Sequence, residues 1–296
     1  MPKKKSKKPG EKIVEKILFF AAILSVLSVL FITFFIALEG APLFRKVGLF
    51  EFLFGREWEP TGDPPKYGIL PFIMGSIWVT LGALVISVPV GLSVGIFLAE
   101  MSKGRVSRFL KSVVELLAGI PSVIYGLFGY IAIAPIIRKM TDSPTGLGIV
   151  TASIVLAIMV LPTIINITDV SIRSVPQEYK EGSLALGATH WQTIYKTLMP
   201  AARSGIIAGI ILGMMRAIGE TMAVLMVAGN SIQMPEGPLS HVRTLTMNIA
   251  TDMKYASGDH WTSLFTTGIV LFVFILVLNL AVQTLLKRSL ERKEGK

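Results

Sequence analysis

Six long apolar stretches, separated by polar connections that are rich in glycine and proline, dominate the pattern of this 296-residue chain. They cover approximately residues 17–38, 69–99, 109–137, 146–167, 205–229 and 263–286. Each reaches the length of roughly 17–25 residues that an α-helix needs to cross the hydrocarbon core of a bilayer. The second and third are long enough to tilt or to contain breaks. The pattern therefore predicts an all-α polytopic membrane protein with six transmembrane helices.

The distribution of positive charge predicts how these helices are oriented. Only 16% of the residues are charged, against about 25% in soluble domains. Most Lys and Arg side chains lie at the two ends of the chain and in the second-to-third and fourth-to-fifth connections. The positive-inside rule then predicts that both termini are cytoplasmic. The expected order is a basic cytoplasmic N-terminus (1–16), a transmembrane helix (17–38), a core of five transmembrane helices (69–286) and a basic cytoplasmic tail (287–296).

The formal net charge of +10 does not call for a nucleic-acid partner. Basic residues beside membrane spans face anionic lipid headgroups, so membrane lipid is the expected partner for this charge. The N-terminal apolar run has no small-residue cleavage site, and we interpret it as a retained anchor. The chain has no cysteine, which excludes disulfides and thiolate metal sites.

The cytoplasmic connection over residues 171–203 is predicted to form two short helices with a break. Pro176 suits the first turn of the first helix, because its missing N–H would be unpaired there. Gly187 is able to leave that helix with a positive φ. Thr189 and Gln192 have the spacing of a capping box for the second helix.

One apolar face is predicted on the second helix, and Pro200 is predicted to end it. The residues of this face are Trp191, Ile194, Tyr195 and Leu198. A bent pair of helices held against a membrane is suited to receive a movement from a partner protein and to transmit it to the neighbouring helices. The alternative is an amphipathic segment that rests on lipid headgroups.

Arg216 and Glu220 lie near the centre of the fifth stretch, with the i, i+4 spacing of a helical pair. An arginine at the bilayer midplane costs about 2.5–3.5 kcal/mol on the insertion scale. Its guanidinium is a rigid fork of donors that matches an oxyanion. We therefore interpret this pair as part of an anion pathway, in which Glu220 holds Arg216 until substrate competes; the alternative is a structural ion pair. In the same stretch Gly205, Gly209 and Gly213 recur every four residues, which favours close helix packing.

The sequence offers no enzyme chemistry of its own. The three histidines are scattered and form no metal-ligand pattern. There is no G-x-x-x-x-G-K-[ST] motif for nucleotide phosphates, and no Ser/His/Asp arrangement can be assembled. No catalytic residue, metal or cofactor is expected in this chain.

Three segments resemble known permeases. The segment EGSLALGATHWQTIYKTLMP resembles the EAA loop of ABC importer permeases, with Glu181, Gly187 and Pro200 at matching distances. Gly182 and Ser183 replace the two alanines of that pattern, and Met199 replaces a leucine. The segments AGIPSVIYGLFG (118–129) and RAIGETMAVLMVAGN (216–230) are similar to phosphate-specific permeases of the PstC and PstA type. The extra N-terminal span makes the PstC type the more similar, and the resemblance covers about residue 71 to the C-terminus.

This resemblance implies a type I ABC importer permease in a prokaryotic inner membrane. The expected partners are a homologous sister permease, two ATPase subunits that use ATP and magnesium, and an extracytoplasmic phosphate-binding protein. In this family the EAA loop couples to the ATPase, and Arg216 and Glu220 match an intramembrane pair with a role in phosphate passage. The coupling residues implied here are Glu181, Gly182, Ser183, Ala185, Leu186, Gly187, Ala188, Thr189 and Pro200.

Other functions remain open from the residues alone. One is a permease for another oxyanion, such as sulfate or molybdate. Another is a secondary carrier or channel that works without an ATPase, and a third is a membrane scaffold. ATP-dependent uptake together with ATPase association would separate these classes.

Overall fold

The computed structural model of the chain describes residues 9–294. The first eight residues of the predicted basic N-terminus and the last two of the predicted tail lie outside the described residues. In the part that is described, six helical segments are long and apolar enough to cross a membrane, as the sequence predicts. They are Ile13–Val47, Leu70–Met101, Ser122–Met140, Ile149–Arg173, His190–Gly219 and Asp259–Leu280.

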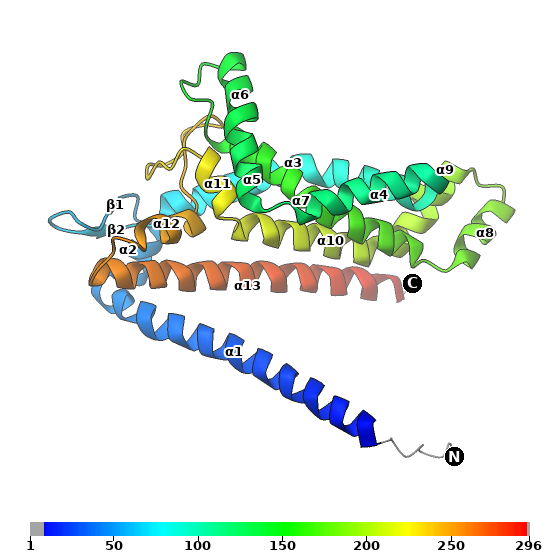
Figure 1. Ribbon diagram of the computed structural model, residues 1–296, viewed down its shortest axis with the longest axis horizontal. Coiled ribbons are helices and arrows are strands. Elements are labelled where there is room, and N and C mark those ends of the chain that lie inside the picture. The colour runs from blue at the N-terminus through cyan, green and yellow to red at the C-terminus, as the bar shows by residue number, and fades with distance from the viewer. Residues whose placement is uncertain (1–8, 295–296) are drawn as a thin grey trace.

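Most of these helices form an elongated bundle with a small lobe at one end (Figure 1). The lobe end carries α2 (Leu49–Phe54), the antiparallel pair β1 (Trp58–Glu59) and β2 (Lys66–Tyr67), and α12 (Leu245–Asp252). The opposite end, called here the loop end, carries α8 (Gln177–Ala185) and α9 (His190–Thr193). The bundle between them includes α3 (Leu70–Ile96), α4 (Gly104–Gly119), α7 (Ile149–Arg173), α10 (Met199–Gly219) and α13 (Asp259–Glu294).

Helix α7 is the centre of the bundle, because glycines on both of its neighbours let them approach it closely. A methyl group added at Gly91 of α3 would lie 2.7 Å from Ile164, and one added at Gly213 of α10 would lie 3.0 Å from the same side chain. The predicted stripe of Gly205, Gly209 and Gly213 faces α7 throughout. Accordingly, 67% of the most apolar window of α7 is buried.

The third apolar stretch, over 109–137, was predicted to be long enough to tilt or to contain breaks, and it is broken. It divides into α4, α5 (Ser122–Phe128), the π-helical turn η2 (Gly129–Ile133) and α6 (Ala134–Met140). The break is at Ile120–Pro121, because proline removes a backbone donor and keeps the residue before it extended. Ile120 accordingly has φ −71° and ψ 128°. Beyond the break, α5 and α6 turn across the direction of the bundle (Figure 1).

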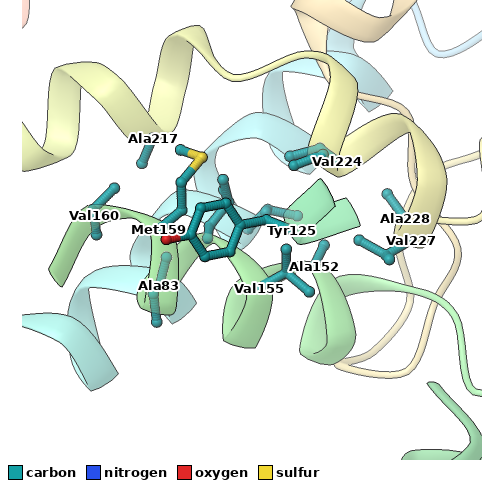
Figure 2. Packing of buried hydrophobic residues seen from close by; sticks show 14 of the residues in the cluster. Ala83, Tyr125, Ala152, Val155, Met159, Val160, Ala217, Val224, Val227 and Ala228 are labelled. Atoms are coloured by element: carbon teal, nitrogen blue, oxygen red, sulfur yellow. The ribbon is translucent and has the colours of Figure 1, made fainter. Parts of the chain in front are cut away.

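The bend after α4 is fixed by Tyr125 of α5. The Tyr125 hydroxyl donates a hydrogen bond to the backbone oxygen of Leu117 over 2.6 Å. Its ring packs into the main hydrophobic cluster, and Figure 2 shows it among side chains of α7 and of α11 (Met222–Val227). This cluster therefore holds the turned segment against the central helix.

The remaining spans are longer than their apolar stretches predicted. Helix α1 (Pro9–Val47) exceeds the predicted 17–38 at both ends, and α7 continues to Arg173. Helix α10 follows α9 through a π-helical turn, η3 (Ile194–Leu198), so the fifth span begins at His190 and not at residue 205. A third π-helical turn, η1 (Phe97–Met101), ends α3 at the loop end. Hydropathy locates only the apolar part of a helix, which explains why the polar ends were missed.

Helix α1 packs mainly on α13, and its C-terminal end also contacts α2, where the Phe44 and Phe52 ring centres lie 5.8 Å apart. A methyl group at Gly40 would lie 2.8 Å from the backbone of Phe265 and Thr266, and the Thr266 hydroxyl donates to the Gly40 oxygen over 2.7 Å. The helix then diverges from the bundle (Figure 1), and its most apolar window is 0% buried in the single chain.

A polar cluster around Arg243 closes the lobe. The guanidinium donates to Asn230 over 2.8 Å and to both Asn248 and Asp252 over 3.0 Å. Asp252 also accepts a hydrogen bond from the Trp58 indole over 3.0 Å. The cluster thus joins the segment after α11, helix α12 and strand β1.

Candidate functional site

Arg216 lies in the last turn of α10 and reaches the middle of α7. Its Nη1 atom donates a hydrogen bond to Oγ1 of Thr163 over 3.4 Å. Thr163 is close to the midpoint of α7, so the guanidinium lies near mid-depth of the bundle. Arg216 is exposed on the surface of the single chain and is not enclosed in dry protein.

The structure corrects the predicted pairing of Arg216 with Glu220. Helix α10 ends at Gly219, and Glu220 has φ −71° and ψ 132°, so the i, i+4 geometry of a helix does not apply to these two residues. The Glu220 carboxylate instead accepts a hydrogen bond from the backbone nitrogen of Ala223 over 3.0 Å, at the start of α11. Among the described residues, no ion pair joins Arg216 to Glu220.

The loop between α7 and α10 has the predicted break. Pro176 directly precedes α8, one position before the predicted first turn. Gly187 has φ +84°, a conformation that favours glycine. The capping box is present: the Thr189 side chain accepts from the Gln192 backbone over 3.2 Å, and the Thr189 backbone donates to the Gln192 side chain over 2.9 Å.

The second half of this loop differs from the prediction in two ways. Pro200 does not end the helix but lies in the first turn of α10, directly after η3. The wider π-helical turn accommodates the proline, which has no N–H to donate to the preceding turn. The predicted apolar face is also divided: Ile194 and Leu198 are buried, whereas Trp191 and Tyr195 are 60% and 63% exposed.

The tip of the loop presents apolar side chains that the rest of the chain does not cover. Leu186 is 91% exposed, and Tyr179 is also exposed. Nothing lies within 4 Å of a methyl group added at Gly182. Ser183 turns inward and forms hydrogen bonds with Thr193 over 3.1 Å and with Thr197 over 3.3 Å. Within the predicted coupling set, therefore, Leu186 and Gly182 face outward and Ser183 joins α8 to α9 and η3.

A buried carboxylate in η1 fastens this loop to the bundle. Glu100 is held by the ammonium group of Lys180 in α8 over 2.5 Å, and the His190 ring at the start of α9 lies 3.8 Å from the same oxygen. In the same turn, the Leu98 backbone oxygen accepts a hydrogen bond from Arg173 at the end of α7. The π-helical end of α3 is thus the point at which the loop and α7 meet.

Sequence reasoning missed three of the residues that the structure brings to these sites: Thr163, Glu100 and Asp169. Asp169 is buried in α7 and pairs with Lys111 of α4 over 2.6 Å and with Arg173 over 2.7 Å. A signal was present for Glu100 and Asp169, which follow the apolar stretches 69–99 and 146–167 within two residues, because acidic residues so close to a membrane span are rare and need partners. Thr163 carries no such signal, and only the packing of α10 on α7 identifies it. Among the described residues, no group of three His, Asp or Glu side chains could hold a metal ion.

The chain is similar in sequence to known membrane permeases. The family described as the binding-protein-dependent transport system inner membrane component matches residues 91–292. The chain is 41% identical over 267 residues to the probable ABC transporter permease protein YqgH of Bacillus subtilis, covering 87% of this chain and 86% of that protein. It is 35% identical over 302 aligned positions to the phosphate transport system permease protein PstC of Xylella fastidiosa strain 9a5c, covering 95% and 91%.

Solved structures of transporters share the fold. A bacterial alginate ABC transporter, in complex with a periplasmic protein that binds an alginate pentasaccharide, gives a TM-score of 0.64 at 14% identity and covers 95% of this chain and 98% of that chain. An inward-facing MetNI methionine ABC transporter gives a TM-score of 0.60 at 17% identity and covers 75% and 97%. At these identities the likeness concerns the fold alone.

Proposed function

Because this chain belongs to the family of inner membrane components of binding-protein-dependent transport systems, we propose that it is one of two permeases in an ATP-driven importer of inorganic phosphate. It is a multi-pass inner membrane protein with the fold of type I ABC importer permeases and is PstC-like in sequence. The observation that carries the proposal is Arg216, a cation at mid-depth whose hydrogen bond goes to a neutral hydroxyl and not to a carboxylate.

Phosphate is the cargo that this arrangement suits. An arginine fork binds tetrahedral oxyanions through two parallel hydrogen bonds. Relatives with 32–35% identity, including PstC of Xylella fastidiosa and of Haemophilus influenzae, bear the name phosphate transport system permease protein. Glu220 contributes by capping α11, which directs the chain from Arg216 into the lobe.

The two ends of the molecule have different partners in this proposal. The loop end is cytoplasmic, in line with the basic residues near it, and the exposed Leu186 tip seats in an ATPase subunit that uses ATP and magnesium. The lobe end faces outward and meets a phosphate-binding protein. A homologous sister permease lines the other half of the path.

Replacing Arg216 with Gln in the assembled transporter tests the pathway role. Hydrogen bonds to charged groups contribute about 1.5–3 kcal/mol, so phosphate uptake is expected to fall about 10- to 100-fold. Arg216→Lys keeps the charge but loses the fork, and uptake is expected to be intermediate. The measurement is ATP-dependent uptake of radiolabelled phosphate into proteoliposomes, with ATPase association followed in parallel by pull-down.

The matched control is Arg138→Gln in α6, which removes the same group at the end of a different helix. Uptake at the wild-type rate by Arg216→Gln would contradict the pathway role. Excess sulfate or molybdate leaves phosphate uptake unchanged if phosphate is the cargo, and strong competition would reassign the oxyanion.

A further inference from the structure

Arg216 contacts a neutral hydroxyl, and the carboxylates near it on the chain are engaged elsewhere. Glu220 caps α11. Asp169, the carboxylate of α7, is only 8% exposed and is held by Lys111 and Arg173. A guanidinium has five N–H donors, and within the described chain only one of those of Arg216 makes a hydrogen bond, the long one to Thr163.

A second polar side chain lies on the same face of α7. Asn166 follows Thr163 by three residues, which places both on one side of the helix. The Asn166 side chain is exposed, and within the described chain its amide has no hydrogen-bond partner. The opposite side of the helix is packed, since Ile164 and Ile165 are buried. An unpaired amide is unfavourable against lipid, so polar residues in such helices face a bundle interior or a wet cavity.

The face of Asn166 leads toward the loop end. Val170, four residues further along α7, is exposed and borders a hollow of about 790 Å³ between α7, α8, η3 and α10. Lys196, Arg203 and Ser204 also line this hollow, and none of the described residues that line it is acidic. From Arg216 to the loop end, the described residues of this surface therefore offer hydroxyl, amide and cationic groups.

We propose that Thr163 and Asn166 extend the Arg216 site into a donor track for phosphate, which leads along α7 to the hollow lined by Lys196 and Arg203. The inference rests on the proposed function, since it concerns the same path. The hydroxyl and the amide bind the oxyanion without adding charge, so phosphate leaves Arg216 by exchanging one donor for the next. The track then delivers it to a cationic exit.

Cysteine accessibility tests whether this face is wet. The chain has no cysteine, so an Asn166→Cys or Thr163→Cys variant carries its single thiol at the proposed track. In the assembled transporter in membrane vesicles, a negatively charged, water-soluble methanethiosulfonate reagent is expected to modify both variants, as followed by the mass of this subunit. Inorganic phosphate is expected to slow the modification. Val277→Cys in α13, whose side chain is 56% exposed but faces no polar track, serves as the unreactive control.

A charge substitution tests the function of the track. Asn166→Asp places a carboxylate beside the path, and like-charge repulsion is expected to lower phosphate uptake on the order of tenfold. Asn279→Asp makes the same change in α13 and is expected to leave uptake unchanged.

The possible outcomes distinguish failure of the donor track from failure of the proposed function. If wild-type vesicles take up phosphate but Asn166→Cys reacts no faster than Val277→Cys, the face is dry and the track is overturned. Wild-type uptake by Asn166→Asp overturns it as well. If the wild-type complex itself shows no ATP-dependent phosphate uptake, the function proposed above fails instead.

Discussion

Gly182 and Gly187 lie five residues apart in the same loop, yet each is a glycine for a different physical reason. Gly187 has φ +84°, so a side chain there strains the backbone of the loop itself. Gly182 has an ordinary helical conformation, and apart from its chain neighbours and the backbone of its own helix no described atom lies within 4 Å of a methyl group built on it. A larger residue at 182 therefore fits this chain, and only a partner would be displaced by it.

Gly182→Leu is expected to leave the folded permease intact and to weaken ATPase association. The added side chain projects from α8 beside the exposed Leu186 tip, where the ATPase groove is proposed to close on it. Displacing one packed contact in an interface costs about 1–3 kcal/mol, so the affinity in a pull-down titration is expected to fall about 5- to 100-fold.

The control for this variant is Gly237→Leu, which also has open space around it but lies in the segment before α12. Its affinity for the ATPase is expected to equal that of the wild type. Equal affinity of Gly182→Leu would show that α8 does not seat in the ATPase.

Some features of single residues could be predicted from the sequence, and others could not. The capping box at Thr189 and Gln192 and the positive φ of Gly187 followed from local spacing, because both depend on neighbouring backbone alone. The pairing of Arg216 with Glu220 required knowing where α10 ends. That end depends on contacts with the lobe, including the hydrogen bond from the Thr246 hydroxyl to the Glu220 backbone oxygen over 2.9 Å. No local pattern contains such a contact.

At the scale of elements, η1 joins the loop to the bundle. The turn receives Lys180 from α8 and His190 from α9 on Glu100, and Arg173 from α7 on the Leu98 oxygen. We therefore expect a displacement of α8 to be transmitted to the end of α3 through these contacts.

Reversing the charge of Glu100 alone is expected to uncouple transport from ATP hydrolysis. The single variant Glu100→Lys leaves Lys180 facing a like charge in a partly buried site, at a cost of about 1–3 kcal/mol. ATPase association is expected to persist while the phosphate imported per ATP hydrolysed falls severalfold. The double variant Glu100→Lys with Lys180→Glu restores the pair and is expected to recover much of that ratio. A double variant no better than the single one would argue against the ion pair as the link.

The π-helical turns were not predicted from the sequence, although two of them share a sequence feature, a proline just after the turn. Pro135 and Pro200 each lie two positions after the end of a π-helical turn, η2 and η3 respectively. A proline cannot donate to the preceding turn, and widening that turn relieves the conflict. Pro89 and Pro162 lie inside α3 and α7 without such a turn, so proline alone does not predict one.

At the scale of the whole molecule, an apolar bundle is closed at the lobe end by a polar cluster. Arg243 contacts Asn230, Asn248 and Asp252, and its guanidinium lies 5.9 Å from the centre of the Phe72 ring in α3. The lobe is thereby fastened to the membrane helices. Burial also raises the pKa of the Tyr67 phenol in β2, at the base of the lobe.

Removing the Arg243 guanidinium is expected to destabilise the lobe. Arg243→Leu leaves Asp252 and Asn248 without their shared donor, and breaking such a buried pair costs about 3–5 kcal/mol. The midpoint of thermal unfolding of the purified protein in detergent is expected to fall by several degrees. Lys254→Leu removes one positive charge from an exposed position beside α12 and is expected to leave the midpoint unchanged. An unchanged midpoint for Arg243→Leu would show that the cluster contributes little.

The six spans were predictable at this scale because hydropathy and length decide membrane crossing without reference to packing. The positions at which the helices change direction were harder to predict. The direction of α5 and α6, for example, depends on Pro121 together with the hydrogen bond from Tyr125 to Leu117. The residues that line a path were the hardest to predict. Thr163 and Asn166 are unremarkable in the sequence, and only the packing of α10 on α7 brings them to one surface with Arg216.

The π-helical turn η3, which precedes Pro200, affects the direction in which the loop tip points. It contains one residue more than an α-helical turn, and one residue corresponds to about 100° of rotation about the helix axis. If residue 200 were alanine, η3 would be free to return to α-helical geometry. The loop tip with Leu186 would then rotate by that angle around the axis of α10. The ring of Pro200 would thus set the direction from which the loop tip approaches the proposed ATPase.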